Sequence, residues 1–80
     1  MPTPTEIAQA LLQTADERGA KTFCPSEVAR SLSRDWRSLM PAIREEAQRL
    51  VDLGQLSCSQ KGRPASPGKA RGPIRLSRVS

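Results

Sequence analysis

This chain contains no histidine and no tyrosine, and Phe23 and Trp36 are its only aromatic residues. Histidine is the commonest general base and a frequent metal ligand, so its absence argues against catalytic pairs of the usual kind. The two cysteines, Cys24 and Cys58, lie far apart and form no Cys-x-x-Cys pair. Because a structural zinc site normally takes four Cys or His ligands, these two cannot complete one alone. We therefore predict no enzyme activity, no metal and no cofactor.

Long apolar runs are also missing. No stretch approaches the ~18 residues of a membrane-spanning helix, and residues 1–6 lack the basic and apolar regions of a secretion signal. We therefore expect a cytoplasmic protein with no membrane partner, in which Cys24 and Cys58 stay reduced and unbridged. A length of 80 residues with 36% apolar content fits a single small domain, residues 1–80, with little room for a deep ligand pocket.

Acidic residues are absent from the last twenty positions. Residues 1–60 carry seven basic and eight acidic side chains, a net charge of −1, whereas residues 61–80 carry six basic side chains and no acid, a net charge of +6. The six are Lys61, Arg63, Lys69, Arg71, Arg75 and Arg78. A basic appendage on a nearly neutral body indicates a polyanionic partner, most commonly nucleic acid.

Two segments in the first half of the chain show the 3.6-residue apolar period of amphipathic helices. The first begins at Thr3, where a Thr-x-x-Glu pattern predicts a capping box, and ends at Gly19. The second follows Cys24, has a proline in its first turn, and ends before a polar turn at residues 33–35.

A third, longer helix is predicted from about Trp36 to Leu53. Pro41 cannot donate a backbone hydrogen bond, so we expect the regular part of this helix to begin near Ser38. The phase of Trp36 places it in the core rather than on a surface that could stack on a base. The apolar phases together predict a buried core made of Ile7, Leu11, Phe23, Val28, Leu32, Trp36, Ile43, Leu50, Leu56, Ile74 and Leu76.

The apolar period then changes from 3.6 to 2. Residues 56–60 and 74–78 alternate between apolar and polar side chains, which predicts a β-hairpin, and residues 22–23 suit a short strand. Residues 61–73, the basic loop, contain three glycines and three prolines and no apolar side chain larger than alanine apart from those prolines. This composition predicts a long exposed hairpin loop outside the core.

The order helix, short strand, helix, turn, helix and hairpin is that of a winged helix-turn-helix. We therefore predict an α+β fold with three helices and a small antiparallel β-hairpin wing. Four segments of the chain are distinctive: 23–30 (FCPSEVAR), 36–44 (WRSLMPAIR), 60–64 (QKGRP) and 70–76 (ARGPIRL). Together they resemble a family of small bacterial winged-helix proteins of unassigned function. The resemblance spans roughly residues 5–78. It implies the fold and no biochemical role.

Two groups of polar residues are candidate nucleic-acid contacts. In the basic loop these are Lys61, Arg63, Lys69 and Arg71. On one flank of the third helix they are Arg37, Arg44 and Gln48. Lys and Arg neutralise backbone phosphates and release counterions, and wings often lie along a DNA backbone. The competing interpretation is a solvated, mobile loop whose charge only raises solubility.

The third helix is nearly neutral, which weakens its case as a helix that reads a DNA groove. Glu45 lies in the middle of its exposed face, where a carboxylate repels phosphate, although glutamate can accept a hydrogen bond from cytosine. The Arg44–Gln48 and Glu45–Arg49 combinations can also be explained as surface pairs four residues apart. If DNA is bound, we expect the loop to contribute more than the helix.

The sequence thus favours duplex DNA as the partner. The alternative is a protein–protein interaction module with no intrinsic DNA binding, which a nearly neutral third helix would suit. RNA binding through the basic loop ranks third, and an enzyme is the least supported class.

Overall fold

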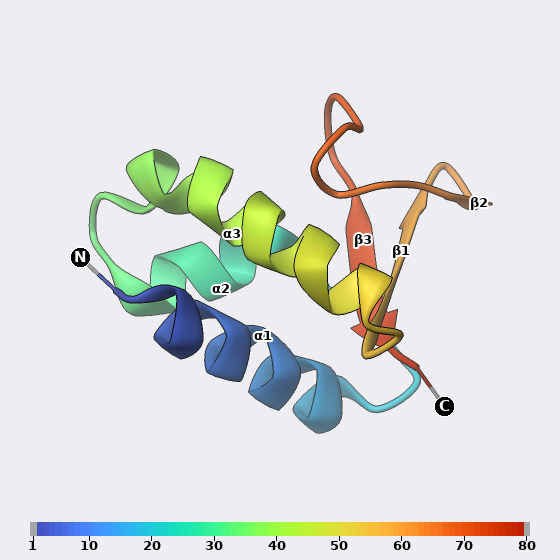
Figure 1. Ribbon diagram of the computed structural model, residues 1–80, viewed down its shortest axis with the longest axis horizontal. Coiled ribbons are helices and arrows are strands. Elements are labelled where there is room, and N and C mark those ends of the chain that lie inside the picture. The colour runs from blue at the N-terminus through green and yellow to red at the C-terminus, as the bar shows by residue number, and fades with distance from the viewer. Residues whose placement is uncertain (1, 80) are drawn as a thin grey trace.

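The computed structural model describes residues 2–79, which form three helices and a three-stranded antiparallel sheet (Figure 1). The elements are α1 (Pro4–Arg18), α2 (Pro25–Leu32), α3 (Trp36–Asp52), β1 (Leu56–Gln60), β2 (Arg63–Pro64) and β3 (Arg75–Arg78). α3 packs on both α1 and α2, and the sheet, in the order β2-β1-β3, stands at one end of the helices. The fold is α+β, as predicted, and is compatible with a winged helix-turn-helix.

Short-range hydrogen bonds define the starts of α1 and α2. The Thr3 N–H donates to Glu6 Oε1 (3.1 Å) and the Glu6 N–H donates to Thr3 Oγ1 (3.2 Å), so the predicted capping box is confirmed. Gly19 ends α1 with a φ of +60°. At α2 the Cys24 N–H donates to Glu27 Oε2 (2.9 Å). Because these backbone N–H groups bond the ionised carboxylates, the pKa values of Glu6 and Glu27 lie below the usual value.

α3 spans Trp36–Asp52, close to the predicted Trp36–Leu53, but its regular part does not begin near Ser38 as expected. The helix begins at Trp36, because the Ser38 N–H donates to the Asp35 carbonyl (3.2 Å) and the Ser38 hydroxyl donates to Asp35 Oδ2 (2.6 Å), which closes a turn ahead of the expected start. Pro41 therefore lies inside α3 rather than in its first turn. There it cannot donate to the Arg37 carbonyl, so the helix lacks one backbone hydrogen bond.

The sheet contains one strand more than the sequence predicted. Lys61 (φ 54°) and Gly62 (φ 79°) form a tight turn with positive φ at both positions, which returns the chain at once along β1 as β2. On the other side of β1, β3 pairs from Leu56↔Arg78 to Ser59↔Arg75. The predicted short strand before α2 is confirmed as a single bridge in which Phe23 and Leu76 exchange two backbone hydrogen bonds of 2.8 Å.

The large side chains of the core follow the predicted apolar phases with three exceptions, and the smaller Ala8, Ala15, Ala29, Ala47 and Cys58 are buried as well. Leu32 and Trp36, which were predicted to be buried, are only half-buried, and Leu39 is buried although it was not predicted. In α3 the difference arises because its buried side carries Leu39, Ile43 and Leu50, whereas Trp36 is the first residue of the helix and lies at its end. The buried residues of the core are Ile7, Ala8, Leu11, Ala15, Phe23, Val28, Ala29, Leu39, Ile43, Ala47, Leu50, Leu56, Cys58, Ile74 and Leu76.

Both thiols are free, as predicted. Cys58 is buried in β1, and this burial raises the pKa of its thiol, while Cys24 is half-buried at the start of α2. Among residues 2–79 the structure holds no cluster of His, Cys, Asp and Glu side chains suited to a metal ion. None of the three helices has the length and apolar character needed to cross a membrane.

Candidate nucleic-acid interface

The basic loop is tied to α3 by Arg44. Its Nη1 donates to the Ala70 carbonyl (2.8 Å) and to the Pro67 carbonyl (3.4 Å), and its Nη2 donates to the Gly72 carbonyl (2.6 Å). Three carbonyls of the loop thus converge on one guanidinium, whose planar fork suits this arrangement. Arg44 was predicted to contact nucleic acid, but the structure places its guanidinium on carbonyls of the loop.

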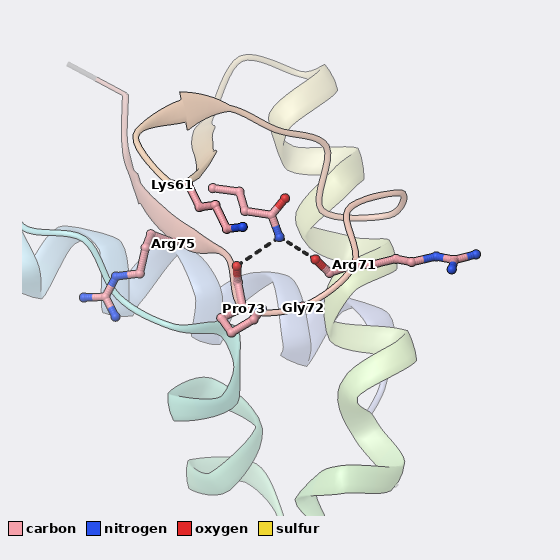
Figure 2. Close-up of a pocket in the computed structure, with 6 residues that line it drawn as sticks. Lys61, Arg71, Gly72, Pro73 and Arg75 are labelled. Carbon is pink, nitrogen blue, oxygen red and sulfur yellow. Dashed lines mark hydrogen bonds between the residues drawn. The ribbon is translucent and has the colours of Figure 1, made fainter.

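Two glutamines add further bonds to the loop. The Gly68 N–H donates to Gln48 Oε1 (3.1 Å), so Gln48, another predicted contact residue, also holds the loop against α3. From β1, Gln60 Nε2 donates to the carbonyls of Arg71 and Pro73 (3.2 Å for Pro73; Figure 2). Glutamines that hold a loop in this way have no sequence motif, and Gln60 was not predicted as part of the site.

The basic loop is also packed, which corrects the expectation of a loop outside the core. The Pro67 side chain is among the fully buried ones of the chain, and Ala65 and Ala70 pack against the core. The Ala70 N–H donates to the Ser66 carbonyl (2.8 Å), which closes a compact turn around Pro67. Proline breaks regular structure, but its ring is apolar, and the ring of Pro67 is buried.

All six basic side chains between residues 61 and 78 are exposed. Within the part of the chain that the structure describes, none of them forms an ion pair with an Asp or Glu. Arg75 is engaged in another way, since its guanidinium donates to Thr22 Oγ1 (3.0 Å) and to Cys24 Sγ (2.8 Å). The predicted contacts of the basic loop therefore stand in solvent with their positive charges unneutralised.

A groove of about 540 Å³ lies where the basic loop returns to β3. It is lined by Gln60, Lys61, Arg71, Gly72, Pro73 and Arg75. Figure 2 shows the Lys61 side chain pointing into this groove, while Arg71 and Arg75 project away from it on opposite sides. Three cations and no acid line the groove, so its surroundings favour an anionic group.

A second hollow, of about 390 Å³, lies between α3 and the basic loop. It is lined by Pro41, Arg44, Glu45, Gln48 and Gly68. Glu45 is exposed, as predicted, and its carboxylate opposes the approach of a phosphate to the middle of α3.

The surface pairs proposed for α3 do not form. Arg49 pairs with Glu46 (2.8 Å) rather than with Glu45, because residues three apart also meet on a helix surface. Gln48 Nε2 donates to Asp52 Oδ1 (2.9 Å), while Arg44 reaches the loop. The remaining candidate on this flank, Arg37, is exposed and lies with its Cζ 4.6 Å from the centre of the Trp36 ring. Arg37, Arg44 and Gln48 thus share a flank of α3 but have different partners.

Fold and site together define a small α+β domain with an anchored, strongly basic loop beside its third helix. The chain belongs to the family described as "Protein of unknown function (DUF3253)", whose model matches residues 4–79. This confirms the resemblance to a family of unassigned function. The comparison with curated proteins gave no match.

Proposed function

We propose that this chain binds duplex DNA, with the cations of the basic loop on backbone phosphates and α3 alongside them. The observation that carries the proposal is the set of exposed cations between residues 61 and 78, which lack ion-pair partners within residues 2–79. Such side chains are free to neutralise phosphates and to release the counterions that surround DNA. Binding rather than catalysis is thus the proposed activity.

The anchoring of the basic loop supports this proposal. A loop that is already held by Arg44, Gln48 and Gln60 loses less conformational freedom on binding than a mobile loop would. The phosphate contacts are assigned to Lys61, Arg63, Lys69 and Arg71, which project from this fixed frame. In this proposal Arg44 and Gln48 act by positioning the loop, and Arg37 is the contact that α3 itself offers.

A second candidate function, docking to another protein, is favoured by the surface of α3. Its exposed face carries Glu45, whose carboxylate disfavours a polyanionic partner, and the apolar side chain of Leu53 at its end is 58% exposed. RNA binding through the basic loop is a third candidate, which the same cations would serve. We further propose that the protein is cytoplasmic, where its thiols stay reduced.

A salt titration with a fluorescent duplex tests the proposal. If the four loop cations neutralise about four phosphates, they contribute roughly −3.6 to the slope of log K against log salt. A variant with Lys61, Arg63, Lys69 and Arg71 changed to Ala should show a slope flatter by about that amount, with an unchanged helical circular dichroism spectrum. Absence of duplex binding by the wild type at low salt would contradict the proposal and favour the protein-docking function.

A further inference from the structure

The turn between α2 and α3 carries a second cationic cluster. The Arg30 Cζ lies 4.5 Å from the centre of the Trp36 ring, and the Arg37 Cζ lies 4.6 Å from the same centre. Both arginines are exposed and Trp36 is half-buried. Arg30 comes from α2 and Arg37 from α3, so the indole brings two guanidiniums from different helices together. We call this cluster the arginine–tryptophan stack.

The charges in the stack are not balanced by ion pairs. Among the described residues neither Arg30 nor Arg37 forms an ion pair with a carboxylate, and the neighbouring Asp35 carboxylate accepts a hydrogen bond from Ser38 (2.6 Å). Contact with the aromatic ring orders a guanidinium plane but leaves its N–H donors available at the edge. Two positive groups held near one ring, with their donors free, suit an anion that accepts several hydrogen bonds, such as a phosphate.

The stack lies on the same flank of α3 as the basic loop. Arg37, Arg44 and Gln48 follow one another at helical spacing, and the latter two bond the loop, so this row of α3 faces it. Arg37 precedes Arg44, which holds the loop, by about 10 Å along the axis, at ~1.5 Å per residue. The separation between Arg37 and the point where the loop is anchored is thus similar to the width of the DNA major groove, about 12 Å. The stack and the exposed cations of the loop can therefore meet phosphates on either side of one groove.

We propose that the arginine–tryptophan stack is a second contact for the backbone phosphates of the duplex that the basic loop binds. The duplex is then held by the stack at the start of α3 and by the loop that is anchored farther along the helix, at Arg44 and Gln48. This inference rests on the proposed function and adds to it the location of a second binding site.

The salt dependence of duplex binding tests the inference. The Arg30→Gln/Arg37→Gln double variant keeps Trp36 and should show a slope flatter than that of the wild type by about 1.8, since each phosphate contact contributes ~0.9. The control, Arg18→Gln/Arg49→Gln, removes the same charge from arginines that already pair with carboxylates and should leave the slope unchanged. Circular dichroism should show that both variants remain folded.

Trp36 provides a second readout. It is the only tryptophan of a chain without tyrosine, so intrinsic fluorescence excited at the indole band reports on the stack alone. The emission should change when duplex is added, also for the basic-loop Ala variant at saturating duplex and low salt. A wild type that binds duplex with unchanged Trp36 emission, and an Arg30→Gln/Arg37→Gln slope equal to the wild-type slope, would overturn this inference and leave the proposed function standing. A wild type that does not bind duplex would overturn both.

Discussion

In the helical part of the chain, residues 1–60, Arg18 and Arg49 each form an ion pair with a carboxylate of that part. The six cations after residue 60 have no such partner within residues 2–79. A third arginine of the helical part, Arg44, bonds carbonyls of the basic loop. Cations thus have two roles: Arg18, Arg44 and Arg49 bond groups of the protein itself, whereas the four cations of the basic loop face solvent.

This difference follows from where the acids are rather than from where the cations are. All eight acidic residues precede Lys61, so carboxylates are at hand for Arg18, on an adjacent helix, and for Arg49, on its own helix. An exposed ion pair contributes only about 0–1 kcal/mol to folding, so the lack of ion pairs for the cations after residue 60 costs little stability. They keep their charge available for a partner instead.

The largest expected effect on stability comes from removing a side chain that joins the helices to the sheet. Phe23 is fully buried and its backbone bonds Leu76 of β3, so it joins the helices to the sheet that carries the basic loop. Phe23→Ala should cost about 3–5 kcal/mol of unfolding free energy, enough to unfold much of so small a domain. Trp36→Ala should cost less, because Trp36 is only half-buried. Urea denaturation followed by circular dichroism measures both, and equal midpoints for the two variants would contradict this account of the core.

A smaller effect should follow from releasing the basic loop while keeping its cations. Arg44→Gln removes the guanidinium that bonds three loop carbonyls and should cost about 1–3 kcal/mol. Amide hydrogen exchange at Gly68 and Ala70 should speed up, and duplex binding should weaken. Arg44→Lys keeps the charge but cannot form the planar set of bonds, so it should also loosen the loop. Wild-type exchange rates in Arg44→Lys would show that charge, rather than bonding geometry, holds the loop.

The smallest effect concerns acid. Because the pKa values of Glu6 and Glu27 are lowered in the folded state, each carboxylate stabilises the fold above its unfolded pKa, and this contribution is lost as the pH falls through the folded value. The melting temperature of the wild type should therefore fall below about pH 4.5, the ordinary value for glutamate. Glu6→Gln/Glu27→Gln should show a shallower fall between pH 5 and pH 3. Parallel melting curves for the two proteins across that range would exclude this linkage.

Local signals made much of the fold predictable. The Thr3–Glu6 capping box, Gly19 at the end of α1 and the period-two pattern of β1 each depend on residues a few positions apart, and each was confirmed. The misplaced start of α3 is also local: the proline rule outweighed the Asp35–Ser38 turn in the prediction.

The structure of the site was less predictable, because it depends on contacts between distant residues. Arg44 meets backbone carbonyls more than twenty positions away, and a carbonyl is present at every residue, so the sequence marks none of them as its partner. Pro67 is buried and its carbonyl meets Arg44 of α3, a contact that no local pattern in the sequence indicates. The charge pattern did identify Lys61, Arg63, Lys69 and Arg71 as exposed cations, since an acid-free segment has no partner nearby.

The central claim is that cations of the basic loop, and not cations in general, bind DNA. The most direct test compares the salt dependence of duplex binding for two variants of equal net charge, Lys61→Gln/Arg71→Gln in the loop and Arg18→Gln/Arg49→Gln in the helical part. The loop variant should show a slope of log K against log salt flatter than that of the wild type by about 1.8, and the helical variant should keep the wild-type slope. Equal changes of slope in both variants would contradict the account, because binding would then follow the net charge of the protein and not the position of its cations.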